Sequence, residues 1–139
     1  MRYLVDTCVW RDFYEDRKNR HAVSLGRPAV AAFLRIISKR SEILICQTIV
    51  KELSKAFSRE KIEEMLGFIS ATGHLRWIEP TRKEVEEART LATARSLPFA
   101  DCLFAVLAKN HGAIVVTRDY HLLRRLKDVV VALRPEEID

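Results

Sequence analysis

Residues 99–119, FADCLFAVLAKNHGAIVVTRD, predict a helix, a tight turn and a strand in direct succession. We expect the helix to run from Phe99 to Asn110 and to close at His111-Gly112. Ala113 to Val116 is a short continuous apolar run, which is typical of a parallel strand covered on both faces. A helix followed by a buried strand is the repeating unit of an α/β sheet.

The same alternation extends through the rest of the chain. Four further short strands are expected at residues 2–5, 43–46, 75–78 and 129–132. The helices expected between them cover residues 10–14, 28–37, 48–57, 58–70, 81–95 and 120–126. We therefore predict a single domain over residues 1–139, a three-layer α/β/α sandwich with a five-stranded, mostly parallel sheet.

Several local signals set the expected helix boundaries. Pro28 suits the first turn of a helix in which Val30, Phe33, Leu34 and Ile37 recur at helical spacing, and we expect this stripe to face the sheet. Thr48 and Ser58 can cap the two helices that follow. Residues 81–84, TRKE, form a capping-box pattern.

Composition and charge are those of a globular protein with a basic surface. The 139 residues are 48% hydrophobic and 31% charged, with a formal net charge of +5. This charge favours a polyanionic partner such as RNA or DNA, although a basic surface also serves solubility alone. The apolar runs fall far below the ~20 residues of a membrane span, and Met1-Arg2 leads directly into a strand, so we expect a cytoplasmic protein without membrane contact.

The three cysteines, Cys8, Cys46 and Cys102, are widely spaced and odd in number. In a chain without an expected secretion signal, this pattern predicts reduced, buried thiols and not a disulfide framework. Cys8 and Cys102 follow acidic residues closely, but we expect both to pack as small apolar side chains and not to bind metal.

Four acidic residues are expected to meet at one edge of this sheet. They are Asp6 after the first strand, Glu52 on the third expected helix, Asp101 in the first turn of the helix at 99–110, and Asp119 after the strand at 113–116. Ligands of open α/β sheets bind at the carboxyl ends of the strands. Carboxylates that crowd there need a cation, and a hard donor set without nearby soft ligands indicates Mg²⁺ or Mn²⁺.

Each acid also has an ordinary structural explanation. Asp6 suits a turn, Asp101 the positive end of a helix dipole, and Asp119 a helix N-cap, while Glu52 suits a surface pair with Lys55. The joint placement favours a metal site, and with a basic chain it predicts a metal-dependent nuclease. The sequence lacks a Gly-x-Ser-x-Gly elbow, a Cys-x-x-Cys pair and a phosphate-binding glycine loop. Enzyme classes that depend on these motifs therefore have little support.

Other side chains near these acids allow two interpretations. His121 could approach phosphate near Asp119, but we expect a surface or capping role. Arg118 and Arg11 suit RNA phosphates and are equally suited to be solvated charges; of the two we favour Arg118. Residues 10–14 contain three aromatic side chains that can stack on bases, although core packing is the commoner role.

Four segments in this order resemble PIN-domain ribonucleases, and most closely the VapC-type toxins of prokaryotic toxin-antitoxin pairs. The segments are Val5-Asp6-Thr7, residues 49–53 (IVKEL), residues 100–105 (ADCLFA) and Thr117-Arg118-Asp119. The similarity covers essentially the whole chain.

The resemblance implies a Mg²⁺ or Mn²⁺ site built from Asp6, Glu52, Asp101 and Asp119 that cleaves RNA, with Thr117 as the hydroxyl residue that supports it. It also implies a 3-2-1-4-5 strand order, a homodimer, and inhibition by a small antitoxin protein. Cys8 departs from the polar residue more usual in the family at that position.

Three other functions remain open at this point. The first is an RNA-processing or RNA-maturation endonuclease of the same family without an antitoxin. The second is a non-catalytic RNA-binding PIN domain, but such domains commonly lose acids that this chain keeps. The third is a receiver-like signalling domain, which would need an acidic pair after the first strand, where Asp6 has no acidic neighbour.

Overall fold

A computed structural model of the chain describes residues 1–15 and 24–139. Within these residues, five strands form one parallel sheet in the order β3-β2-β1-β4-β5, which confirms the expected sheet and its strand order. The strands are β1 (Arg2–Val5), β2 (Glu42–Ile45), β3 (Leu75–Trp77), β4 (Ala113–Val116) and β5 (Ala132–Leu133).

The register of the central strands brings their carboxyl ends to the same level. Leu4 of β1 pairs with Leu44 of β2 on one side and with Val115 of β4 on the other, and all three side chains are fully buried. Val5 pairs with Val116, and the Asp6 amide donates to the Val116 carbonyl at 2.9 Å. Asp6 and the residues after β4 therefore leave the sheet side by side.

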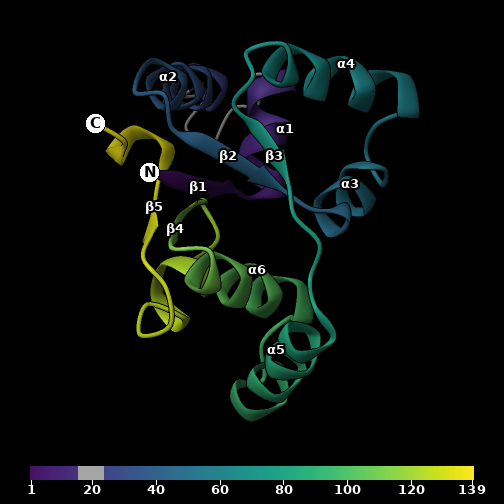
Figure 1. Cartoon of the computed structure of the whole chain (residues 1–139), viewed down its shortest axis with the longest axis vertical. Coiled ribbons are helices and arrows are strands. Elements are labelled where there is room, and N and C mark those ends of the chain that lie inside the picture. Colours follow the sequence, from purple (N-terminus) through teal and green to yellow (C-terminus); the bar gives the residue numbers. More distant parts are fainter. Residues whose placement is uncertain (16–23) are drawn as a thin grey trace.

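Helices cover both faces of this sheet (Figure 1). They are α1 (Thr7–Glu15), α2 (Gly26–Ser38), α3 (Gln47–Leu53), α4 (Arg59–Ser70), α5 (Arg82–Arg95), α6 (Phe99–Asn110), the π-helical turn η1 (His121–Arg125) and the 3₁₀ turn η2 (Pro135–Glu137). In Figure 1, α1, α2 and α4 lie above the sheet and α6 lies below it, with α5 packed on the outer side of α6. Among the described residues, no helix is long and apolar enough to cross a membrane.

Side-chain caps fix the starts of two helices as expected. Ser58 accepts a hydrogen bond from the Lys61 amide at 3.3 Å and caps α4. Thr81 and Glu84 form the reciprocal capping box of α5, at 3.2 and 2.9 Å. The expectation for Thr48 was wrong, because α3 begins one residue earlier and Thr48 lies inside its first turn.

The buried face of α2 differs from the expected stripe. Phe33 is buried, but Leu34 is 62% exposed and Val30 is 37% exposed. The buried residues, Ala29, Ala32, Phe33 and Ile36, repeat the same helical spacing one position earlier. Phe33 packs against Trp10 and Phe13, with ring centroids 4.7 and 4.8 Å apart, and the small alanines let α2 approach closely.

The end of the chain also differs from the expected pattern. The last strand was expected at 129–132, but the Val129 and Val130 amides both donate to the Leu126 carbonyl and form a turn. Strand β5 therefore begins only at Ala132. η2 then packs against α2, where Ile138 is buried and its carbonyl accepts a hydrogen bond from Arg35 at 3.2 Å.

Candidate active site

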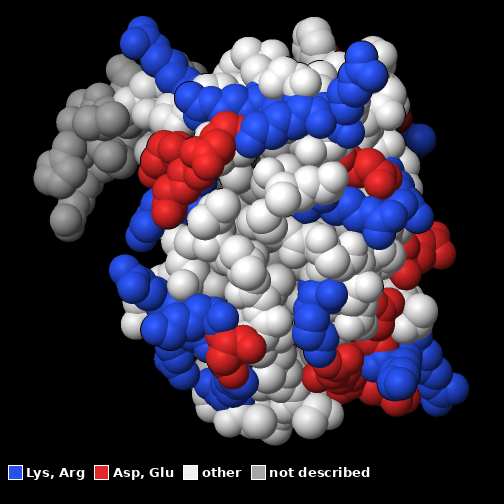
Figure 2. All heavy atoms as spheres, turned by 60° about the vertical axis from the view of Figure 1, so that its left-hand side comes forward, with Lys and Arg blue, Asp and Glu red and all other residues white. Residues whose placement is uncertain are grey.

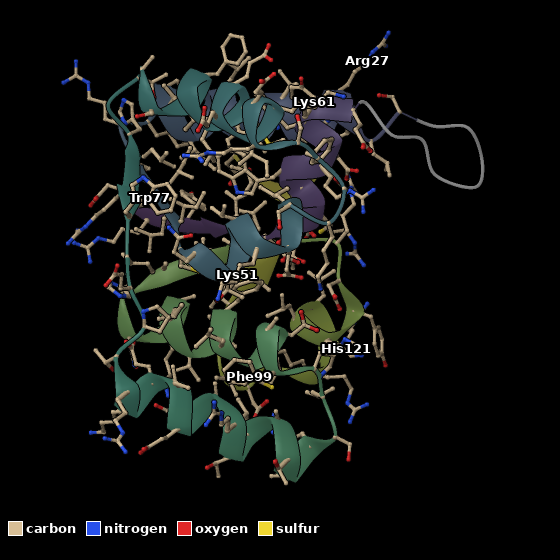
Figure 3. All side chains as sticks on the ribbon, turned by 90° about the vertical axis from the view of Figure 1, so that its right-hand side faces the viewer. Arg27, Lys51, Lys61, Trp77, Phe99 and His121 are labelled. Atoms are coloured by element: carbon tan, nitrogen blue, oxygen red, sulfur yellow. The ribbon has the colours of Figure 1, made fainter. Side chains whose placement is uncertain are left out.

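Four acidic side chains line one cavity of about 210 Å³ at the carboxyl edge of the sheet. Asp6 follows β1, Glu52 lies in the last turn of α3, Asp101 lies in the first turn of α6, and Asp119 follows β4 after two residues. Thr7, Cys8 and Arg11 of α1 complete the lining. Figure 3 looks onto this edge and shows Lys51 on α3, Phe99 at the start of α6 and His121 on η1.

Asp6 is the most enclosed of the four acids, with 5% of the residue exposed. Its Oδ1 accepts a hydrogen bond from the Thr7 amide at 2.8 Å, and its Oδ2 accepts one from the Thr117 hydroxyl at 2.7 Å. Burial raises the pKa of Asp6 to about 6, because these hydrogen bonds only partly replace lost hydration, and the negative charge of Asp101 adds to the rise.

Thr117 connects two of the acids. Its fully buried hydroxyl donates to Asp6 and accepts a hydrogen bond from the Asp119 amide at 2.9 Å. One hydroxyl group can serve both partners because it offers one donor and two acceptor positions. The residue that directly follows β4 therefore fixes the side chain of Asp6 and the backbone of Asp119.

Glu52 reaches the cavity from the half-buried side of α3. Its Oε1 accepts a hydrogen bond from the Thr7 hydroxyl at 3.2 Å. Burial raises the pKa of Glu52, and the charges of Asp6 and Asp119 raise it further. This electrostatic coupling places Glu52 in the same cluster as the acids of the sheet edge.

Asp101 and Asp119 share a histidine that the sequence did not place in the site. Nδ1 of His121 lies 3.0 Å from Oδ2 of Asp101 and 3.2 Å from Oδ1 of Asp119. Burial raises the pKa of Asp101, the charge of Asp119 adds to the rise, and His121 opposes it. The side chain of His121 is 38% exposed, in keeping with the expected surface position, and its imidazole lies beside two of the acids, which we did not expect.

Cys8 also lies closer to the acids than expected. Its Sγ is 3.5 Å from Oδ2 of Asp6 and 3.8 Å from Oγ1 of Thr117, because α1 begins immediately after Asp6 and its first turn folds back over that side chain. Burial and the charge of Asp6 raise the pKa of Cys8, so it acts as a neutral thiol that donates to Asp6. Cys46 and Cys102 are buried, as expected.

Arg118, for which we expect a phosphate contact, forms ion pairs within the protein. Its guanidinium lies 2.8 Å from Oε2 of Glu136 and 3.5 Å from Oδ2 of the fully buried Asp12. Only 21% of its side chain is exposed. The aromatic residues at 10–14 likewise pack inward, with Trp10 fully buried.

The positive charge of the chain is spread unevenly over the surface. Figure 2 shows Lys and Arg side chains in a band over α2, on the side of the molecule where the strands begin. Four of the exposed basic residues of this region are Arg27, Arg35, Lys39 and Arg40. On the opposite side, where the strands end, Arg11 lines the acidic cavity and Lys51 is exposed on α3.

The donor atoms of the cavity suit a hard divalent cation. Four carboxylates line the cavity, an imidazole nitrogen lies beside two of them, and three of the carboxyl groups have raised pKa values from burial and mutual repulsion. A cation bound among them would remove this repulsion. Oxygen-rich sites of this kind fit Mg²⁺ or Mn²⁺.

The family model described as the PIN domain matches residues 3–128 of the chain. The chain belongs to the PIN-domain family. The match includes all four acids, Thr117 and His121, and PIN domains are a nuclease family.

Solved structures with the same fold include three from bacteria. VapBC2 from Rickettsia felis, bound to a DNA fragment from its promoter, has a TM-score of 0.65 at 20% identity, over 96% of this chain and 98% of that one. A toxin-antitoxin complex from Klebsiella pneumoniae has a TM-score of 0.66 at 18% identity, over 98% and 99% of the two chains.

FitAcB from Neisseria gonorrhoeae has a TM-score of 0.64 at 21% identity, over 97% of this chain and 99% of that one. At such identities the likeness establishes the PIN-domain fold. A search of curated protein sequences gives no significant match.

Proposed function

We propose that this PIN domain is a Mg²⁺- or Mn²⁺-dependent endoribonuclease and the toxin of a type II toxin-antitoxin pair. The main support for the proposed nuclease activity is that four acidic side chains line one cavity, namely Asp6, Glu52, Asp101 and Asp119. They come from separate elements of the sheet edge, and Thr117 ties two of them together. Retention of all four acids also argues against a non-catalytic RNA-binding domain.

In this proposal the four carboxylates hold the metal. Once bound, the cation supplies positive charge for the developing phosphate transition state and activates water for hydrolysis of the phosphodiester bond. Thr7 and Thr117 orient Glu52 and Asp6 through their hydroxyl groups. Arg11 lines the same cavity and would bind an RNA phosphate beside the acids.

The proposed partner is a small antitoxin protein. The support is the PIN-domain fold shared with two toxin-antitoxin structures, VapBC2 and the Klebsiella pneumoniae complex. An antitoxin that places an Arg or Lys side chain among the four acids would replace the metal's charge and block the RNA path. We also propose a homodimer, which the resemblance to VapC-type toxins implies.

A metal-depletion assay tests the enzymatic part. Purified protein should cleave single-stranded or structured RNA with Mg²⁺ or Mn²⁺, and EDTA should abolish cleavage, because the site offers oxygen ligands and no activated nucleophile. Cleavage that continues at an undiminished rate in EDTA would contradict the proposed mechanism.

Growth of the native host, with the neighbouring gene deleted, tests the toxin role. Expression of the wild-type chain should slow growth, Asp6→Asn should be harmless, and co-expression of the neighbouring gene should restore growth. If wild type and Asp6→Asn are equally harmless while the purified enzyme still cleaves RNA, the chain is an RNA-processing endonuclease and not a toxin.

A further inference from the structure

His121 combines two properties that the mechanism above does not use. Its imidazole lies beside Asp101 and Asp119, at one side of the acid cluster. Among the described residues, the candidate ligand atoms of Asp101, Asp119 and His121 all lie within 4.8 Å of one another, and the one nitrogen among them is that of His121. We propose that His121 is a metal ligand of this site and that it makes the site prefer Mn²⁺ over Mg²⁺. This inference rests on the proposed metal-dependent function.

The distances around Nδ1 match those between neighbouring ligands of one ion. Two adjacent ligand atoms of an octahedral ion, each about 2.1 Å from the metal, lie about 3.0 Å apart. Nδ1 of His121 lies 3.0 Å from Oδ2 of Asp101 and 3.2 Å from Oδ1 of Asp119. In a metal-bound state, Nδ1 of His121 would offer its lone pair to an ion that both carboxylates contact, in place of the hydrogen bond that it shares with Asp101 in this structure.

Hydrogen bonds fix the backbone of the turn that carries His121 before any metal binds. The His121 amide donates to Oδ1 of Asp119 at 2.7 Å, and the Asp119 amide donates to Thr117 at 2.9 Å. The turn that carries the histidine is thus fixed by the same hydrogen bonds that fix Asp119. The side chain remains 38% exposed and so stays open to an entering ion.

A nitrogen ligand changes which metal the site favours. Carboxylates suit Mg²⁺ and Mn²⁺ alike, whereas Mg²⁺ is bound almost entirely through oxygen and affinity for nitrogen rises along the transition metals. Asp6 and Glu52 keep the other side of the cavity rich in oxygen. The imidazole therefore adds affinity for Mn²⁺ and little for Mg²⁺.

Calorimetric titration of the full chain with each metal alone tests the inference. His121→Ala should weaken Mn²⁺ binding by roughly tenfold or more, because loss of even a residue that only supports a metal ligand costs about tenfold. Mg²⁺ binding should stay nearly unchanged. His111→Ala removes a half-buried imidazole at the other end of α6 and should change neither affinity. If His121 had only a structural role, His121→Ala would weaken the binding of both metals alike, and this result would overturn the inference.

Spin-echo EPR of Mn²⁺ bound to the wild-type protein gives a second test that needs no variant. Coupling to an imidazole ¹⁴N nucleus is expected, and a spectrum without nitrogen coupling would contradict ligation by His121. If the wild type binds neither metal, the proposed function itself fails. If it binds Mn²⁺ but His121→Ala binds it equally well, only the role of His121 fails.

Discussion

Asp6 must be ionised to bind a cation, yet its surroundings disfavour the charge. Two hydrogen bonds and the Cys8 thiol support its carboxylate, but burial outweighs them and raises the pKa to about 6. A carboxyl group with a raised pKa is more easily neutralised by protons than an exposed one. Metal binding at this residue should therefore weaken as the pH falls below about 6.

The raised pKa of Asp6 gives a prediction for stability in EDTA. Because the folded-state pKa of about 6 exceeds the ordinary value of 3.8, the stabilising contribution of Asp6 is complete below pH 3.8 and is lost as the pH rises through 6. At about 1.4 kcal/mol per pKa unit, the loss is at most roughly 3 kcal/mol. Asp6→Asn removes this loss.

Denaturant unfolding of wild type and Asp6→Asn from pH 4 to pH 7 measures this effect. As the pH rises, the free energy of unfolding of the variant should increase relative to that of the wild type. The comparison cancels the titrating groups outside the acid cluster, and within the cluster Asp6→Asn also removes the rise that Asp6 causes in the pKa of Glu52. A difference that stays constant over this range would show that Asp6 is not desolvated as the structure indicates.

Thr117 allows a test with closely matched variants. Thr117→Val keeps the shape of the side chain but removes the hydroxyl that serves Asp6 and the Asp119 amide. We expect a stability loss of about 1–3 kcal/mol and a loss of metal affinity of about 10–100-fold. Thr117→Ser keeps the hydroxyl and should retain most of the stability and most of the metal affinity. Equal metal affinity of the two variants in calorimetry would contradict the bridging role.

The meeting of the four acids in one cavity could be predicted from the sequence because each follows a strand end or lies on an adjoining helix, whereas Thr117 was implied only by the resemblance to PIN-domain ribonucleases. His121 and Cys8 could not be placed, because their orientation depends on turns that local patterns do not specify. The His121 amide donates to Asp119, and its imidazole turns toward Asp101 of α6, with Nδ1 3.0 Å from Oδ2. Cys8 is turned inward because α1 starts immediately after Asp6.

At the scale of elements, Arg118 links three segments that are distant in sequence. It leaves the sheet after β4, and its guanidinium meets Asp12 of α1 and Glu136 of η2. Arg118 also lies between Thr117 and Asp119, both of which take part in the acid cluster. The ion pairs therefore help to hold that loop against α1 and the C-terminal turn.

Removal of this guanidinium should destabilise the fold. Arg118→Ala takes away the hydrogen bonds to Glu136 and the cation 3.5 Å from the fully buried Asp12, and we expect a loss of about 1–3 kcal/mol. Arg59→Ala removes an exposed pair with Glu63 and should cost about 0.3–0.5 kcal/mol. Thermal and denaturant unfolding compare the two variants, and similar small losses would contradict the structural role of Arg118.

Element types were largely predictable, whereas some faces and boundaries were not. Apolar runs placed β1, β2 and β4 within one residue, since buried parallel strands have continuous apolar sequences. The face of α2 was misassigned because Val30 and Leu34 are more hydrophobic than the alanines that are buried. Close packing selected the small residues, and single-residue hydrophobicity does not report that preference.

At the scale of the whole molecule, the sheet topology creates the candidate site. The strand order 3-2-1-4-5 places β1 and β4 side by side, so Asp6 and Asp119 leave the same edge although 113 positions separate them in the sequence. α3 and α6 then contribute Glu52 and Asp101. The basic band over α2 lies on the other side, so net charge alone did not locate the site.

The rate of RNA cleavage by Asp101→Asn tests most directly whether this acid cluster is the catalytic metal site. Asp128→Asn is the matched control, because Asp128 is an exposed carboxylate paired with Arg95 at 2.7 Å and lies outside the cavity. With Mn²⁺ or Mg²⁺, Asp101→Asn should lower the rate by more than roughly 100-fold, because loss of a residue that only supports a metal ligand can already cost that much. Asp128→Asn should cleave at nearly the wild-type rate. Wild-type cleavage by a folded Asp101→Asn protein would contradict the account.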